Sequence, residues 1–339
     1  MSPEELPSAT ETGKLQVMHL KRYWQKSIFK RDGKLEPGSF HDEWKTDTTL
    51  LTVLGLGLEQ TMVYVYREKP SFEQFENWIV ETNGVPDAEK VNQFNQLISN
   101  KDTVADDRKW QYELLTSEDL DFWDENGYVI IREAVSKECC EQAVEAICNF
   151  IAIDRYDPAT WYEDHPARQG IMVQFFQHPA LDQNRKADKV RKAFQDIWKR
   201  KDIWVNTDRA GFNAPETERH KFRGPRLHWD VSIKQPVPFG TQGILYLADT
   251  AENQGAFTLV PGFQNKIEEW MQNLPPGTNP RQTNLYALGP KPIAANAGDL
   301  IIWHQALPHG SSPNTSALPR FVQYINYEPI DKKESEVWI

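Results

Sequence analysis

The sequence predicts an α+β protein with a helical N-terminal part and a C-terminal antiparallel β unit of sandwich or barrel type. The first observation is the helical spacing of apolar residues, as at Phe72, Phe75 and Ile79 behind the capping residue Ser71. The second is a change at Ile203, after which short β-prone runs are separated by turn residues. The chain is therefore expected to start helical and to end as a β unit.

Capping residues and apolar periodicity place the individual elements. The apolar stretch at 50–64 favours a buried helix, but its β-prone end leaves a buried strand open. Ser117 and Ser136 are expected to cap the helices that follow them. The predicted helices are 50–64, 72–82, 87–99, 118–126, 137–153, 186–199 and 264–273, and the predicted strands are 128–132, 203–207, 227–233, 243–248, 256–260, 299–303 and 321–327.

We expect three parts along the chain. Residues 1–18 are polar and predicted to be a loose tail, residues 19–110 a helical extension, and residues 111–339 the β-containing domain. The charged segment 101–109 marks the boundary between the last two parts. One interpretation makes the extension a docking or oligomerisation module, so that the protein would act partly through a carrier, a partner or a second copy.

Composition excludes several classes of partner. The net charge of −11 argues against nucleic acid and against an anionic membrane surface. The first residues lack the basic and apolar regions of a secretory signal, and the longest apolar run, 50–58, is too short to span a bilayer. Cys139, Cys140 and Cys148 have no disulfide-framework spacing and are interpreted as reduced thiols of a cytoplasmic protein.

The most informative motif is His228-Trp-Asp230. On an extended strand His228 and Asp230 leave the same face, while Trp229 leaves the other toward an apolar layer. An imidazole and a carboxylate on one face are two of the three ligands in non-haem Fe(II) oxygenases. The third ligand should be a later histidine, and the residues alone leave His304 and His309 open.

The motifs in the second half resemble the phytanoyl-CoA dioxygenase family. The resemblance is carried by His228-Trp-Asp230, Gly255 to Gly262, Gly298 to His304, His309-Gly-Ser-Ser-Pro-Asn and Arg320, and it takes in 115–131; residues 1–110 match nothing that we recognise. It implies a double-stranded β-helix core with flanking helices. It also implies an oxygenase that uses Fe(II), 2-oxoglutarate and O2.

The resemblance also implies roles for individual residues. His228, Asp230 and His309 would be the metal ligands, which leaves His304 as a histidine that packs in the core or contacts one of the ligands. Arg320, eleven residues after His309, would bind the distal carboxylate of 2-oxoglutarate, a task suited to a planar guanidinium. Ser311 and Tyr246 would also contact the co-substrate. Since related halogenases lack the carboxylate, Asp230 favours hydroxylation of a small molecule with release of succinate and CO2.

Substrate contacts are predicted less directly. Segment 219–226 has four Lys or Arg residues and leads into the metal motif, so it is a candidate for attracting an anionic substrate; a solvated loop is the alternative. Arg209, Arg226 and Trp229 are the candidate substrate residues, although Arg209 could instead pair with Asp208. The alternative to an enzyme is a catalytically inactive β-helix that only binds a ligand.

Overall fold

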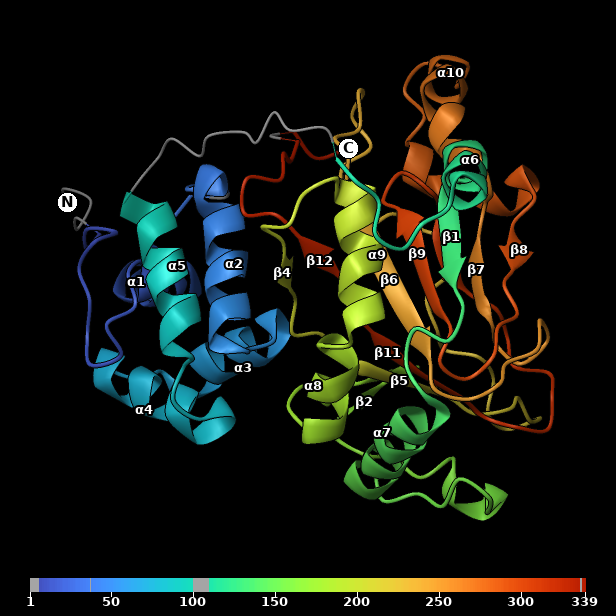
Figure 1. The fold of residues 1–339 in the computed structure, drawn as a ribbon, viewed down its shortest axis with the longest axis horizontal. Helices are drawn as coiled ribbons and strands as arrows, with labels where there is room; N and C mark the ends of the chain where they lie inside the picture. The colour runs from blue at the N-terminus through green and yellow to red at the C-terminus, as the bar shows by residue number, and fades with distance from the viewer. Residues whose placement is uncertain (1–5, 37, 100–109, 336) are drawn as a thin grey trace. The chain divides into compact units, whose positions relative to one another are not determined.

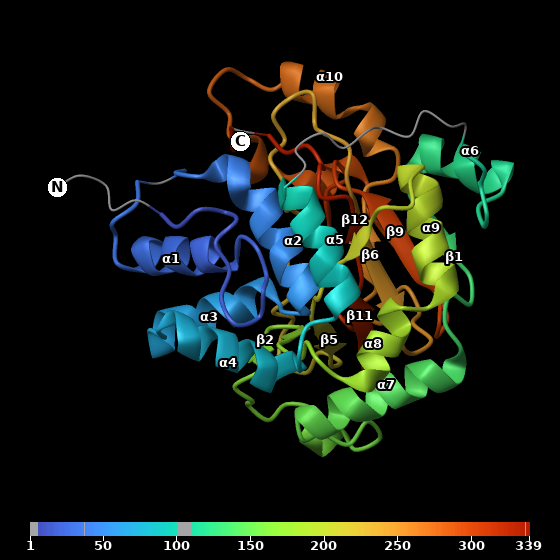
Figure 2. The same ribbon diagram turned by 60° about the vertical axis from the view of Figure 1, so that its left-hand side comes forward.

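The computed structural model describes residues 6–36, 38–99, 110–335 and 337–339 (Figures 1 and 2). The chain divides into two compact units. The first contains the described residues of Met1–Lys109 with Trp204–Thr207 and Pro329–Asp331, and the second contains those of Trp110–Ile203, Asp208–Glu328 and Lys332–Ile339. The predicted boundary at 101–109 lies outside the described residues.

The first unit is built from helices around one apolar core. Leu20, Leu50, Phe75 and Phe94 are among its fully buried side chains. Its helical elements are α1 (Leu20–Arg31), η1 (His41–Glu43), α2 (Trp44–Leu54), α3 (Leu58–Glu68), α4 (Phe72–Asn83) and α5 (Ala88–Ser99), and it also holds β4 (Trp204–Val205).

Local sequence explains where these helices begin and end. Ser71 caps α4 as predicted, in a capping box with Gln74. The apolar stretch expected as one helix or a strand is instead two helices, α2 and α3. Gly55 lies between them in the left-handed region, with φ of 66°, and it ends α2 as its C-cap.

The tail is packed rather than loose over residues 6–18. Val17 is fully buried in the core of the first unit, and the main-chain N–H of Met18 donates to Asn95 Oδ1 (2.9 Å). The side chain of Glu76 accepts from the N–H of Leu15 (3.0 Å). The polar composition of the segment did not predict this packing, because one apolar residue and a few main-chain hydrogen bonds are enough to hold it.

Among the described residues no single helix is long and apolar enough to cross a bilayer. The segments His41–Leu54 and Leu58–Glu68 meet the length and composition test only as a pair, across a bend of 94°.

The second unit combines helices with two antiparallel sheets. Its described helical elements are α6 (Ser117–Asn126), α7 (Lys137–Phe150), η2 (Pro158–Thr160), α8 (Pro179–Arg185), α9 (Asp188–Trp198), η3 (Phe263–Asn265), α10 (Ile267–Gln272), η4 (Pro280–Gln282) and η5 (Leu285–Leu288). Its strands are β1 (Tyr128–Ile131), β2 (Arg168–Gln169), β3 (Met172–Val173), β5 (Ala210–Asn213), β6 (Thr241–Tyr246), β7 (Phe257–Leu259), β8 (Lys291–Pro292), β9 (Leu300–His304), β10 (His309–Ser311), β11 (Arg320–Tyr324) and β12 (Tyr327–Glu328).

The larger sheet has the strand order β1-β9-β6-β11-β5-β3-β2 and the smaller one the order β10-β7-β8 among the described residues. Their inner faces meet in one core, where the rings of Phe257 on β7 and Trp303 on β9 lie 4.3 Å apart. On the outer face of the larger sheet Gln323 contacts α8, and a Cβ at Gly243 would meet Phe194 of α9. Figures 1 and 2 show α9 running along this face.

Several elements of the second unit differ from the prediction. Thr116, not Ser117, caps α6, because it forms the capping box with Asp119. The helix expected at 186–199 is α9, and the helix α8 that precedes it was not predicted. Residues 227–233, expected as a strand, contribute only a bridge between His228 and His309. Strand β5 was missed because its residues carry little β propensity, and pairing with β11 forms it.

Candidate metal centre

The side chains of His228, Asp230 and His309 meet beside β10 of the smaller sheet. His228 Nε2 lies 3.2 Å from Asp230 Oδ1, and His309 Nε2 lies 3.2 Å from Asp230 Oδ2. The three ligand atoms all fall within 4.8 Å of one another. Two imidazoles and one carboxylate in such a group are the donor set of non-haem iron sites.

Strand geometry brings these residues together across about eighty residues of sequence. His228 and His309 exchange both main-chain hydrogen bonds (2.9 and 3.0 Å) as a cross-strand pair. Alternation then puts Asp230 on the same side as His228 and puts Trp229 on the other. Trp229 is 2% exposed, and its Nε1 donates to the carbonyl of Ala306 (2.8 Å). This candidate substrate residue therefore lies in the apolar core, on the face opposite the ligand side chains.

Main-chain carbonyls orient both imidazoles. His228 Nδ1 lies 2.7 Å from the carbonyl oxygen of Arg226, and His309 Nδ1 lies 3.1 Å from that of Leu307. A carbonyl only accepts, so each Nδ1 carries a proton and Nε2 is left to face Asp230. Histidine ligands of metals are commonly oriented in this way.

Two residues that the sequence did not predict, Gln242 and Trp303, hold the carboxylate of Asp230 in place. Gln242 Nε2 on β6 donates to Asp230 Oδ2 (2.6 Å), and Trp303 Nε1 on β9 donates to Gln242 Oε1 (3.2 Å). Partial burial by itself would raise the pKa of the Asp230 carboxyl, but contacts with His228 and His309 hold that pKa well below its usual range. No local motif marks Gln242, because only the pairing of β6 with β9 brings it here.

The two candidates for the third histidine are separated by a turn. β9 ends at His304 and β10 begins at His309, so the two side chains do not share a surface. His304 lies between the rings of Trp123 and Phe239, and its Nδ1 accepts from the N–H of Ala306 (3.0 Å). Burial lowers the pKa of His304 to about 4, which keeps its imidazole neutral. His309 is the one placed beside His228 and Asp230.

A buried cation lies near this group. Arg320 on β11 is fully buried, and its Nη1 donates to Ser311 Oγ on β10 (3.1 Å). Its Nε and Nη2 have no hydrogen-bond partner among the described residues. Unmatched donors on a buried guanidinium are costly, so the arrangement is complete only when an anion accepts from them.

Tyr246 lies beside Arg320, but its hydroxyl is already used. The hydroxyl donates to the carbonyl of Ile293 and accepts from the N–H of Phe257, both at 2.8 Å. Burial raises the pKa of Tyr246 to about 12, against the opposing charge of Arg320. Tyr246 thus joins the two sheets through its hydroxyl and leaves only its ring for another molecule.

The remaining substrate candidates lie in different surroundings. Arg209 Nε is 3.2 Å from Asp208 Oδ1, which is the ion-pair alternative considered from the sequence. Arg226 is exposed, and its side chain forms no ion pair with any described residue.

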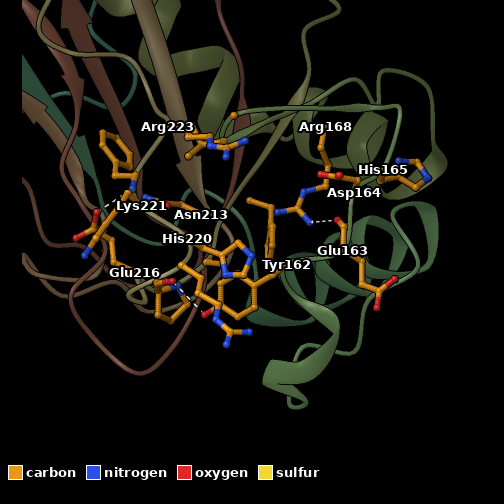
Figure 3. A pocket seen from close by; sticks show the side chains of 17 residues that line it. Tyr162, Glu163, Asp164, His165, Arg168, Asn213, Glu216, His220, Lys221 and Arg223 are labelled. Atoms are coloured by element: carbon orange, nitrogen blue, oxygen red, sulfur yellow. Dashed lines mark hydrogen bonds between the residues drawn. The ribbon is translucent and has the colours of Figure 1, made fainter.

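A cavity of about 380 Å³ adjoins the basic segment 219–226 (Figure 3). It is bounded by 162–171 on one side and by 212–223 on the other, and the proposed metal ligands do not line it. The rings of Tyr162 and His220 stack at 4.5 Å, and Figure 3 shows Arg223 and Arg168 above them. Arg219, Lys221 and Arg223 form no ion pair with the described residues.

A second group of ligand-type residues lies in the first unit. His19, Glu43 and Asp47 also have ligand atoms within 4.8 Å of one another. Here Lys26 Nζ is 2.6 Å from Glu43 Oε2 and 2.7 Å from both oxygens of Asp47, and Arg22 Nη2 is 2.7 Å from Glu43 Oε1. The ammonium of Lys26 thus neutralises both carboxylates of this group.

Comparison with known proteins agrees with the motif-based resemblance. The model of the phytanoyl-CoA dioxygenase (PhyH) family matches residues 123–322. The chain therefore belongs to this family. A Dictyostelium discoideum relative that carries the same family name is 25% identical over 260 residues, which cover 62% of this chain and 74% of that protein. The family uses Fe(II), 2-oxoglutarate and O2, so the chain is a non-haem iron, 2-oxoglutarate-dependent oxidoreductase.

Solved structures to which the chain is similar include EctD from S. alaskensis with bound Fe and HygX from Streptomyces hygroscopicus with nickel and 2-oxoglutarate. EctD is 16% identical, with 68% of this chain and 82% of that chain covered and a TM-score of 0.48. HygX is also 16% identical, with 64% and 88% covered and a TM-score of 0.45.

Proposed function

We propose that the protein hydroxylates a small molecule at an iron bound by His228, Asp230 and His309. The larger and smaller sheets would be the two halves of a double-stranded β-helix, with the iron at its open end. The donor set supports this assignment, because both Nε2 atoms and the carboxylate converge while both Nδ1 atoms are held by main-chain carbonyls. Ligands on one side of the ion leave its other positions for the co-substrate and O2.

The observation that carries the proposal is the incomplete hydrogen bonding of Arg320. A fully buried guanidinium with two unmatched nitrogens, next to the Ser311 hydroxyl, fits a carboxylate that accepts from both residues. We assign Arg320 and Ser311 to the distal carboxylate of 2-oxoglutarate. Tyr246 would contribute its ring to the wall of this pocket.

Fe(II) with 2-oxoglutarate supplies the oxidising chemistry, in which O2 is consumed, the keto acid becomes succinate and CO2, and the substrate gains a hydroxyl group. The chain itself binds and orients. Gln242 holds Asp230 in place, and Trp303 holds Gln242. The buried apolar layer behind Trp229 excludes water from that side of the segment that carries His228 and Asp230.

Segment 219–226 supports an anionic substrate. Its exposed cations are unpaired among the described residues although the protein carries a net charge of −11. Such charges raise the encounter rate of an anion, and salt screens the effect. Replacing Arg226 with Ala is expected to raise KM for an anionic substrate and to reduce its salt dependence; unchanged values would remove Arg226 from the substrate site.

The direct test is an anaerobic titration of the metal-free protein with Fe(II) and 2-oxoglutarate. A visible charge-transfer band should form at one equivalent of each, and it should require the histidine ligands. No band would contradict the metal assignment. Screening anionic small molecules for succinate release and analysing the product by mass spectrometry then identifies the reaction. A product that gains one oxygen atom supports hydroxylation, whereas one that loses two hydrogens or changes only its stereochemistry contradicts it.

A further inference from the structure

The segment that carries His228 and Asp230 is an edge of the smaller sheet. On one side His228 exchanges main-chain hydrogen bonds with His309. In an antiparallel pair the main-chain groups of the neighbouring residues point the opposite way. The carbonyls of Trp229 and Val231, on either side of Asp230, therefore point away from β10 and need hydrogen-bond donors from elsewhere.

Arg281 supplies both hydrogen bonds. It lies on η4, in the insertion between β7 and β8, far from the metal motif in sequence. Its Nη1 donates to the carbonyl of Trp229 (2.7 Å), and its Nη2 donates to that of Val231. Two donors on one rigid plane match two carbonyls that are separated by one residue, so the guanidinium takes the place of a neighbouring strand.

Residues 337–339 complete the arrangement. Arg281 Nε donates to the carbonyl of Ile339 (2.9 Å), and the ring of Trp338 lies 4.7 Å from the guanidinium carbon. Ser232 Oγ donates to the carbonyl of Val337 (2.6 Å), directly after the segment that carries His228 and Asp230. Three distant segments thus meet at Arg281, and its conformation is held by all of them.

We propose that Arg281 is the positioning residue of the iron ligand Asp230, an inference that rests on the proposed function. It fixes the backbone on both sides of Asp230, as Gln242 fixes the carboxylate itself. Without Arg281 the backbone at Asp230 gains freedom, and the carboxylate must be ordered again each time the metal binds. Iron affinity, rather than overall stability alone, should therefore depend on Arg281.

The test compares Arg281→Met, Arg281→Lys and the control Arg132→Met by anaerobic Fe(II) titration with saturating 2-oxoglutarate. Arg132 is a suitable control because it pairs with Asp299 (2.6 Å) in the same unit without touching residues 228–232. We expect Arg281→Met to weaken Fe(II) binding by about 10- to 100-fold, the usual effect of losing a residue that orients a ligand. Arg281→Lys, with charge but no planar fork, should lie between Arg281→Met and the wild type, and Arg132→Met should bind as the wild type does.

Thermal unfolding of the metal-free variants separates positioning from simple destabilisation. If Arg281→Met lowers Tm no more than Arg132→Met does while its Kd for Fe(II) rises, the positioning role is supported. Equal Fe(II) affinities for wild type and Arg281→Met would overturn it and leave the proposed function intact. A wild-type protein that forms no charge-transfer band would overturn both.

Discussion

The protein contains two groups of histidine and carboxylate side chains whose ligand atoms lie equally close together. His228, Asp230 and His309 lie in the second unit, and His19, Glu43 and Asp47 lie in the first. In both groups the ligand atoms fall within 4.8 Å of one another. Proximity of ligand-type residues therefore does not by itself distinguish a metal site.

The difference lies in what neutralises the carboxylates. In the first unit Lys26, only 6% exposed, donates to Glu43 and Asp47, so the cluster is a closed network of ion pairs. At Asp230 no Lys or Arg side chain forms an ion pair among the described residues, and this side chain is 48% exposed. One cluster is complete as it stands, while the other has an open side and donors that converge on it.

Removing a ligand from the group of His228, Asp230 and His309 should have the largest effect on activity. His309→Ala or Asp230→Ala is expected to abolish the charge-transfer band and to reduce succinate formation by roughly 10³-fold or more, because the metal is lost with its chemistry. His304→Ala should keep the band. The reverse pattern, with the band lost in His304→Ala and kept in His309→Ala, would show that the distal ligand is misassigned.

Removing the cation of the cluster of His19, Glu43 and Asp47 should lower the free energy of unfolding without changing Fe(II) binding. Lys26→Met leaves the carboxylates of Glu43 and Asp47 without their buried cation, at an expected cost of about 3–5 kcal/mol in the free energy of unfolding. Urea denaturation with hydrogen exchange of α1 and α2 amides measures it. Arg31, which pairs with Asp32 at the end of α1, provides the control variant Arg31→Met. A loss of Fe(II) binding in folded Lys26→Met would contradict the separation of the two clusters.

Arg320 tests the other half of the proposed site. Arg320→Leu should raise the Kd for 2-oxoglutarate by at least about 30-fold, since a buried charge pair loses one partner, at a cost of roughly 2 kcal/mol or more. The metal-free variant should be no less stable than the wild type, because an unmatched buried guanidinium is removed. The charge-transfer band measures the first quantity and thermal unfolding the second. An unchanged Kd would rule out Arg320 as the anchor.

The smallest expected effect is a pH dependence of stability that arises from Glu43. Burial alone would raise the pKa of Glu43, but hydrogen bonds from Arg22 and Lys26 lower it to about 2 from 4.5. A depressed carboxyl pKa stabilises the fold above the unfolded value and loses this contribution as the pH falls through the folded one. Stability of the first unit should decline between about pH 4.5 and pH 2, by roughly 1–2 kcal/mol after allowance for solvent screening.

Glu43→Gln should flatten this decline when the free energy of unfolding is measured as a function of pH. The control variant is Glu113→Gln in the second unit, because Glu113 is an exposed carboxylate that pairs with Lys201. An acid response that survives Glu43→Gln unchanged would assign it to another group.

The sequence by itself determined the features that depend on short spacing. Ser71 and Gln74 are three residues apart and close a capping box, so α4 was predicted with its start. His228 and Asp230 are two residues apart, and alternation in an extended segment puts both on one side. The family resemblance added His309 and Arg320 as their partners. In each case the physical constraint acts within a few residues or is carried by a motif.

Only the tertiary structure decided what comes from distant segments. Gln242, Trp303 and Arg281 have no local signal, because their positions beside Asp230 depend on strand pairing and on where an insertion folds back. The same holds for Lys26, which turns a group of metal-ligand residues into an ion-pair network. The sequence names the groups that can act as ligands, and long-range packing decides which of them are left open to bind.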